Sequence, residues 1–186
     1  LLGPVKNKPI QLRNGTIYCP SSSEHDGWRV HFETSTDDGK TWNVIGPIHS
    51  GKEFASIQPS ILSHKDGRLQ ILCRSKQSKV TQSWSNDQGK TWSPMTASKL
   101  PNPNSGTDAI TLNDGRQLIV YNHSTRRGVF PSGRNILNVA ISNDGVKWES
   151  TLILEKAQGE YSYPAVIQAK DSMIHITYTY KRRSIK

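Results

Sequence analysis

The sequence predicts an all-β fold built from repeated four-stranded units. A box of the form Ser-x-Asp-x-Gly-x-x-Trp begins at Ser35 and again at Ser85, and a copy one residue shorter begins at Ser142. Asn-Gly and Asp-Gly pairs stand between β-rich runs, and they mark tight hairpins because glycine tolerates a positive φ. The composition, with 14 glycines, 10 prolines, 5 tryptophans and 6 tyrosines among 186 residues, suits short strands joined by turns rather than a helical bundle.

The strands of each unit follow one order. A first strand begins near each of four positions, which are Pro9, Pro59, Asp108 and Pro164, and it leads to a turn at 14–15, 66–67, 114–115 or 171–172. A second strand follows the turn (69–74 and 117–122), and a third strand ends in the box (79–85 and 135–142). The fourth strand starts near the box tryptophan. Repeated four-stranded units of about 40–50 residues predict a β-propeller.

The boxes have a structural explanation. Aspartate accepts backbone N–H groups within its own turn, and glycine supplies the left-handed position. The tryptophan covers the hairpin and fills space between strands. We therefore interpret Asp37, Asp87 and Asp144 as turn staples and not as the acids of a hydrolase.

Strand direction predicts which loops share a rim. Successive antiparallel strands reverse, so the strand-start and second-to-third-strand loops lie on one rim, opposite the boxes. That rim collects candidate ligand-binding groups, which are Lys8, Gln58, Arg74, Asp108, Asn122, Arg134, Glu160, Tyr161 and Tyr163. Two arginines beside tyrosines and carboxylates predict a site for a compact anionic ligand.

These residues resemble a known family. The boxes resemble the Asp-box or BNR repeats of sialidases (neuraminidases). Segments 3–15 and 100–106 resemble the opening of that family's third blade and a loop before its fifth. Segment 71–75 resembles the strand with the second arginine of the family's triad, and segment 133–139 resembles the segment with the third. Tyr161-Ser162 resembles the site of the nucleophilic tyrosine, and the resemblance spans essentially all 186 residues.

The resemblance implies a six-bladed β-propeller of the sialidase type. This chain would cover roughly the last four blades, from the third to part of the sixth, as one partial domain over residues 1–186. The family's first arginine and its general-acid aspartate belong to the earlier blades, and we find neither in this sequence. The end of the chain at Lys186, within an expected strand, favours a fragment.

The implied activity is that of an exo-α-sialidase-like glycoside hydrolase for terminal sialic acid or a related acidic sugar. Arginine forks bind a sugar carboxylate bidentately, and a neutral tyrosine suits an attack beside that negative charge. The resemblance assigns Tyr161 as nucleophile and Arg74 and Arg134 as carboxylate clamps. Their place on the same rim makes Lys8, Gln58, Asn122 and Tyr163 the further candidate substrate contacts. Tyr163 is the alternative to Tyr161, and Arg126 or Arg127 is the alternative to Arg134.

One departure from the family pattern affects catalysis. The glutamate that partners the family's tyrosine falls near Gln58, which cannot act as a base. We hypothesise that Asp108 or Glu160 replaces the missing carboxylate. Two other functions stay open: a glycosidase or lyase for another acidic glycan, and a non-catalytic propeller that binds glycan or protein.

The composition also indicates which kinds of partner and cofactor to expect. The net charge of +9 is compatible with an acidic ligand, and no nucleic-acid-binding signature accompanies it. No run approaches the ~20 apolar residues of a membrane span. The histidines lack metal-ligand spacing, so we expect no metal and no cofactor. Cys19 and Cys73 are expected to be free buried thiols. Oligomeric state stays open, and a secreted or periplasmic location is our guess for a bacterial source.

Overall fold

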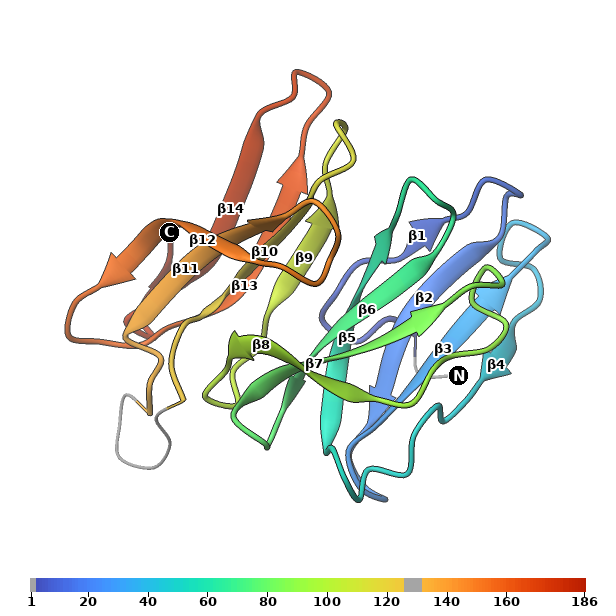
Figure 1. The fold of residues 1–186 in the computed structure, drawn as a ribbon, viewed down its shortest axis with the longest axis horizontal. Coiled ribbons are helices and arrows are strands. Elements are labelled where there is room, and N and C mark those ends of the chain that lie inside the picture. Colours follow the sequence, from blue (N-terminus) through green and yellow to red (C-terminus); the bar gives the residue numbers. More distant parts are fainter. Residues whose placement is uncertain (1–2, 126–131) are drawn as a thin grey trace.

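Four antiparallel sheets follow one another along the chain (Figure 1). The computed structural model describes residues 3–125 and 132–186. The first three sheets each contain four strands in sequence order, and the fourth contains three. The predicted all-β propeller with meander blades is therefore confirmed, and we number the four blades of this chain in sequence order. The described part of the chain contains no helix that is long and apolar enough to cross a membrane.

The strand bounds agree with the repeat. The first blade contains β1 (Ile10–Gln11), β2 (Ile17–Ser23), β3 (Arg29–Ser35) and β4 (Asn43–Ile45). The second blade contains β5 (Ser56–Ser63), β6 (Leu69–Ser75), β7 (Lys79–Ser85) and β8 (Thr96–Pro101). The third blade contains β9 (Asp108–Thr111), β10 (Gln117–Asn122), β11 (Ile136–Ser142) and β12 (Glu149–Lys156). The fourth blade contains β13 (Tyr161–Gln168), β14 (Ile174–Tyr180) and β15 (Ser184–Ile185).

The turn between the first two strands is the same in every blade. An N–H group donates to the carbonyl three residues earlier, in the pairs Gly15 to Leu12, Gly67 to His64, Gly115 to Leu112 and Ser172 to Ala169. These turns lie toward the top of Figure 1, and we call their end of the molecule the hairpin rim. The opposite end, where Arg74 and Arg134 lie, is the arginine rim.

The boxes form closed networks at the hairpin rim. In the second blade, Ser85 Oγ donates to Asp87 Oδ1 (2.8 Å) and accepts the Gly89 N–H (2.8 Å). Asp87 also accepts the Thr91 N–H (2.9 Å) and hydroxyl (2.5 Å). Hydrogen bonds from the Thr91 hydroxyl, the Thr91 N–H and Ser85 lower the pKa of Asp87 to about 2. The staple interpretation of the boxes is therefore confirmed, because the carboxylate is occupied within its own turn.

The second and third boxes also bind the blade before them. Tyr18, in β2, donates its hydroxyl to the carbonyl of Gly89 in the second box (2.6 Å). Gln70, at the equivalent place in β6, donates Nε2 to the carbonyl of Gly145 in the third box (2.8 Å). We call this contact the inter-blade key. It joins neighbouring sheets at a fixed point along their length.

Three apolar clusters fill the spaces between neighbouring blades. Between the first and second blades, Phe32 stacks on the box tryptophan Trp92 with ring centroids 4.8 Å apart. Cys73 lies in the same cluster, and both it and Cys19 are buried and unpaired, as expected. Burial of such apolar surface is the main force that holds the blades together.

Two inner strands contain a matching irregularity. The register of β5 shifts between Ile57 and Ser60, and that of β13 shifts between Ser162 and Ala165. Within these bulges Gln58 has a φ of 55° and Tyr163 a φ of 50°, and a proline follows each of them. A bulge interrupts the alternation of side chains along a strand. Each bulge therefore redirects one side chain at the arginine rim.

Candidate functional site

One residue from each blade converges at the arginine rim. The four turn carbonyls belong to residues 12, 64, 112 and 169, and the residues six positions before them are Lys6, Gln58, Gly106 and Tyr163. A Cβ atom on Gly106 would lie 2.9 Å from Lys6 Cε, 3.2 Å from Tyr163 Cδ1 and 3.3 Å from Gln58 Oε1. We call these four residues the mouth ring. Glycine is needed in it because a side chain there would meet all three neighbours.

Arg74, at the end of β6, borders the mouth ring. Its Nε donates to Asn104 Oδ1 (2.9 Å) and its Nη1 donates to Gln58 Oε1 (3.4 Å). The guanidinium carbon lies 5.1 Å from the ring centroid of Trp28, which is within cation–π range. These contacts fix the direction of the Arg74 guanidinium.

Arg134 reaches the same place from the third blade. Its Nη2 donates to the backbone carbonyl of Asn104 (3.1 Å) and its Nη1 donates to Glu160 Oε1 (3.1 Å). Its guanidinium carbon lies 5.7 Å from the ring centroid of Tyr163. Asn104 thus contacts both arginines, and the structure brings Arg74, Arg134 and Tyr163 together.

Tyr163 and Tyr161 have opposite environments. Tyr163 is 43% exposed, whereas the Tyr161 side chain is fully buried. The Tyr161 ring packs in the cluster between the third and fourth blades, 5.4 Å from the ring centroid of Tyr180, and its hydroxyl donates to the Gln158 carbonyl (3.3 Å). Only the Tyr161 backbone approaches the site, where its N–H donates to the Arg134 carbonyl (2.8 Å). The structure therefore corrects the expected position of the Tyr161 phenol, which lies in the core.

Asp108 is buried away from the mouth ring, two residues deeper along the inner strand. It accepts hydrogen bonds from Lys8 Nζ (2.9 and 2.7 Å), Ser60 Oγ (3.2 Å) and the N–H groups of Ala109 (3.0 Å) and Val166 (2.8 Å). These partners come from all four blades. Asp108 and Lys8 therefore connect blades, and the Asp108 carboxylate is already saturated with donors.

Glu160 is a partner of arginine. Its Oε1 accepts hydrogen bonds from Arg134 and from Ser162 Oγ (2.9 Å), and its Oε2 accepts one from Arg182 (3.3 Å). Burial raises the pKa of Glu160, but the hydrogen bonds from Ser162 and Arg134 and the positive charge of Arg134 and Arg182 outweigh it, so the net shift is downward. Glu160 therefore stays ionised and orients Arg134.

Asn122 is fully buried at the end of β10. Its Nδ2 donates to the carbonyls of Ile136 (3.0 Å) and Tyr161 (2.8 Å). It thus links the backbones of the third and fourth blades, although a substrate contact was expected. The alternative clamps Arg126 and Arg127 lie outside the described residues.

Lys6 was missed by motif reasoning. Its Nζ donates to the carbonyls of Thr107 (2.7 Å) and Pro164 (2.9 Å) and to Asn7 Oδ1 (2.9 Å). Burial is the largest cause that lowers the pKa of Lys6, to about 8. Lys6 can be identified in the sequence by its distance from the Asn-Gly turn. Gln58 and Tyr163 lie at the same distance from the turns of their own blades.

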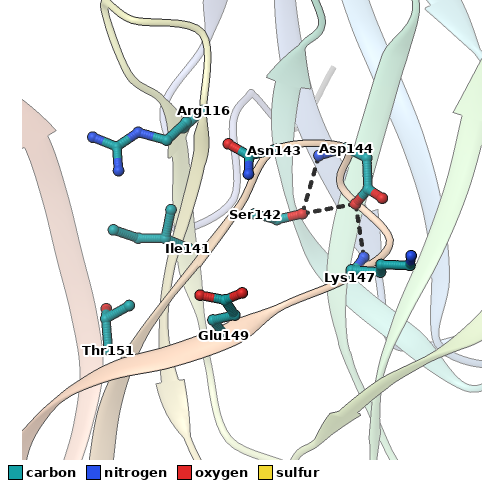
Figure 2. Close-up of a pocket in the computed structure, with 8 residues that line it drawn as sticks. All are labelled: Arg116, Ile141, Ser142, Asn143, Asp144, Lys147, Glu149 and Thr151. Atoms are coloured by element: carbon teal, nitrogen blue, oxygen red, sulfur yellow. Dashed lines mark hydrogen bonds between the residues drawn. The ribbon is translucent and has the colours of Figure 1, made fainter.

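A separate pocket lies at the other end of the molecule. Figure 2 shows a pocket of about 250 Å³ at the hairpin rim, where Arg116 and Glu149 lie beside the third box. Its Asp144 is already bonded within the box, to Ser142 and the Lys147 N–H. The candidate site is therefore defined by the convergence of charged groups at the opposite rim. Across residues 3–125 and 132–186, no group of three or more His, Cys, Asp or Glu is placed to hold a metal ion.

Comparisons with known proteins agree with this architecture. A family model described as a BNR repeat-like domain matches residues 1–176. A leech intramolecular trans-sialidase, complexed with 2,7-anhydro-Neu5Ac, superimposes with a TM-score of 0.73 at 18% identity over 95% of this chain and 28% of its own. The trans-sialidase of Ruminococcus gnavus, in complex with oseltamivir carboxylate, gives 0.72 at 21% identity over 95% of this chain and 39% of its own.

A protein of unknown function from Dyadobacter fermentans gives a TM-score of 0.74 at 18% identity over 92% of this chain and 48% of its own. The chain thus spans less than half the length of these structures, and at such identities the likeness establishes the fold. The search of curated proteins gave no match.

Proposed function

Because the chain belongs to the BNR repeat-like domain family, we propose that the protein is an exo-acting glycoside hydrolase for terminal sialic acid or a related acidic sugar. One observation carries the proposal: Arg74 and Arg134 come from different blades, and both are held on Asn104 beside the exposed ring of Tyr163. Paired guanidinium groups suit a carboxylate, which they bind with charge-assisted hydrogen bonds.

Tyr163 is the proposed nucleophile in place of Tyr161. A phenol attacks without a full negative charge, so it is not repelled by the sugar carboxylate. Its oxygen would bond to the anomeric carbon as the glycosidic C–O bond breaks, and water would then release the sugar. Its place in the mouth ring and its 43% exposure support this role.

Gln58 favours a second candidate, which is binding of the acidic sugar without turnover. Gln58 stands in the mouth ring with Tyr163, and an amide cannot take the phenol proton. Asp108 and Glu160 are saturated by other donors, so the hypothesis that either replaces the missing base has no support in their contacts. If catalysis occurs, we expect it to be slow.

A fluorogenic sialoside assay on the full-length protein tests the proposal. Tyr163→Phe should lower kcat about 10³-fold or more while binding of the sugar stays nearly unchanged, because only the nucleophile is lost. Tyr161→Phe is the matched control and should retain turnover. Loss of turnover in the Tyr161 variant alone would reject the assignment. Binding that depends on Arg74 and Arg134, with no turnover in the parent, would establish the second candidate.

A further inference from the structure

The dipeptide Lys6-Asn7 connects the first blade to all three other blades. Lys6 Nζ donates to the carbonyls of Thr107 in the loop before β9 and Pro164 in β13, and Asn7 Nδ2 donates to the carbonyl of Gln58 in β5 (2.8 Å). Thr107 directly follows Gly106, and Pro164 directly follows the mouth-ring tyrosine. Two adjacent side chains therefore hold the backbone of the mouth ring in every other blade.

The backbone at these places needs such support. Gln58 and Tyr163 have positive φ angles, which are strained for a residue other than glycine. Such conformations persist when surrounding contacts fix them. The bonds to the carbonyls of Gln58 and Pro164 act directly on the two strained segments.

Lys6 also contributes charge to the mouth. The charged groups that face it are Lys8 and Arg74, which lower its pKa, and Asp108, which raises it. Asp108 already forms an ion pair with Lys8 (2.7 Å), and within the described part of the chain Lys6 itself donates only to uncharged oxygen atoms. The positive charge of Lys6 is therefore not neutralised by a carboxylate in contact with it.

We propose that Lys6 is a positioning residue that holds Tyr163 and Gln58 in the mouth ring. It also adds a third positive charge to those of Arg74 and Arg134. Anion binding therefore weakens when Lys6 loses its proton. The contribution of Lys6 to anion binding rests on the proposed function. The positioning of Tyr163 by Lys6 does not rest on it.

The first arm of the test needs no sugar. In the full-length protein labelled with ¹³C-tyrosine, the Tyr163 ring signal, assigned with Tyr163→Phe, should shift with a midpoint near pH 8, where Lys6 titrates. Lys6→Arg keeps a cation that does not titrate in this range, so the shift should disappear. A midpoint that persists in Lys6→Arg, or a parent signal that does not move, would overturn the proposal.

The second arm measures the affinity for free N-acetylneuraminic acid from pH 6 to pH 10. The parent should lose about 10-fold in affinity across the Lys6 titration, as expected for one charge at short range. Lys6→Met should bind weakly and without this pH dependence, and Lys40→Met, on the exposed hairpin rim, should behave like the parent. If the parent binds no sugar while the Tyr163 shift follows Lys6, the proposed function fails and the positioning role stands.

Discussion

At Gln58 and Tyr163 the direction of a single side chain decides what the site contains. Both residues take a left-handed conformation before a proline, and both side chains reach the space around Gly106. The result is that an amide contacts Arg74 and a phenol ring lies beside Arg134. Residue 58 therefore decides whether the mouth contains a group that can take the phenol proton.

Gln58→Glu should raise turnover of a fluorogenic sialoside by about 10²-fold, which is the usual contribution of a general base. The new carboxylate would stand next to the Tyr163 ring and take the phenol proton. Gln88→Glu, an exposed change of the same charge at the hairpin rim, serves as the control. A Gln58→Glu protein that turns over no faster than the parent would contradict a nucleophilic role for Tyr163.

At this scale the sequence predicted that Arg74, Arg134 and a tyrosine lie together, and the structure brings them together with Tyr163, whereas the Tyr161 phenol is buried in the core. The family resemblance of Tyr161-Ser162 favoured Tyr161, and regular alternation would place Tyr161 and Tyr163 on the same face of a strand. The bulge at Tyr163 reverses that relation, and a left-handed non-glycine residue is not readable from local propensity. Arg74 and Arg134 were found because arginines at strand ends stand out in the motif.

The boxes and hairpin turns are the elements that the sequence specifies best. Each is closed by bonds within about eight residues, so a local pattern such as Asp-x-Gly is sufficient. The inter-blade key was not predicted, because its donor and acceptor are far apart in sequence: Tyr18 and Gly89 in one case, and Gln70 and Gly145 in the other. Only the packing of two sheets brings them together.

The box aspartates should make stability depend on acid pH. The pKa of Asp37 and that of Asp87 are both lowered to about 2, mainly by hydrogen bonds from the threonine four residues later. A lowered folded pKa gives stability that is present above the unfolded value near 4 and is lost as the pH falls toward 2. Urea unfolding from pH 6 to pH 2 should therefore show a smaller acid-dependent loss in Asp87→Asn than in the parent.

Asp38→Asn is the control for this measurement, because the structure records no hydrogen bond to the Asp38 side chain among the described residues. An acid-dependent loss that is equal in the parent and in Asp87→Asn would show that the boxes do not contribute to it.

Tyr18→Phe tests the inter-blade key. It removes the hydroxyl that donates to the Gly89 carbonyl and accepts the Trp92 Nε1–H (3.2 Å). We expect a loss of about 1–2 kcal/mol in the free energy of unfolding, measured with denaturant. Tyr180→Phe, whose hydroxyl has no hydrogen bond recorded in the described structure, should change stability by less than about 0.5 kcal/mol. Equal effects of the two substitutions would refute the key.

Asp108 acts at the scale of the whole molecule, because its bonds reach every blade. Asp108→Asn should lower the free energy of unfolding by about 2–3 kcal/mol, since it weakens the bonds that the buried carboxylate accepts from the partly exposed Lys8 and from the Val166 N–H. Turnover per folded molecule should stay unchanged. A drop in kcat of about 10²-fold with unchanged stability would instead support the original hypothesis that Asp108 is the base.

The arrangement of the blades explains why the roles of Asp108 and Glu160 were not predictable. Both were candidates because a carboxylate was needed near the tyrosine. Their partners Lys8 and Arg134 are far away in sequence, and only the closing of neighbouring sheets around a common axis pairs them. The number and order of blades were predictable, because they follow from a repeat that the sequence displays directly.

The inter-blade key has a consequence for how such a chain can grow by gene duplication. The second unit carries both a donor on its second strand, Gln70, and a backbone acceptor in its own box, Gly89, so a tandem copy of that unit would already fit its neighbour. Substitution at the acceptor residue cannot delete a main-chain oxygen, whereas the donor is free to diverge, as tyrosine and glutamine have here. The inter-blade key therefore persists through substitutions that would abolish a hydrogen bond between two side chains.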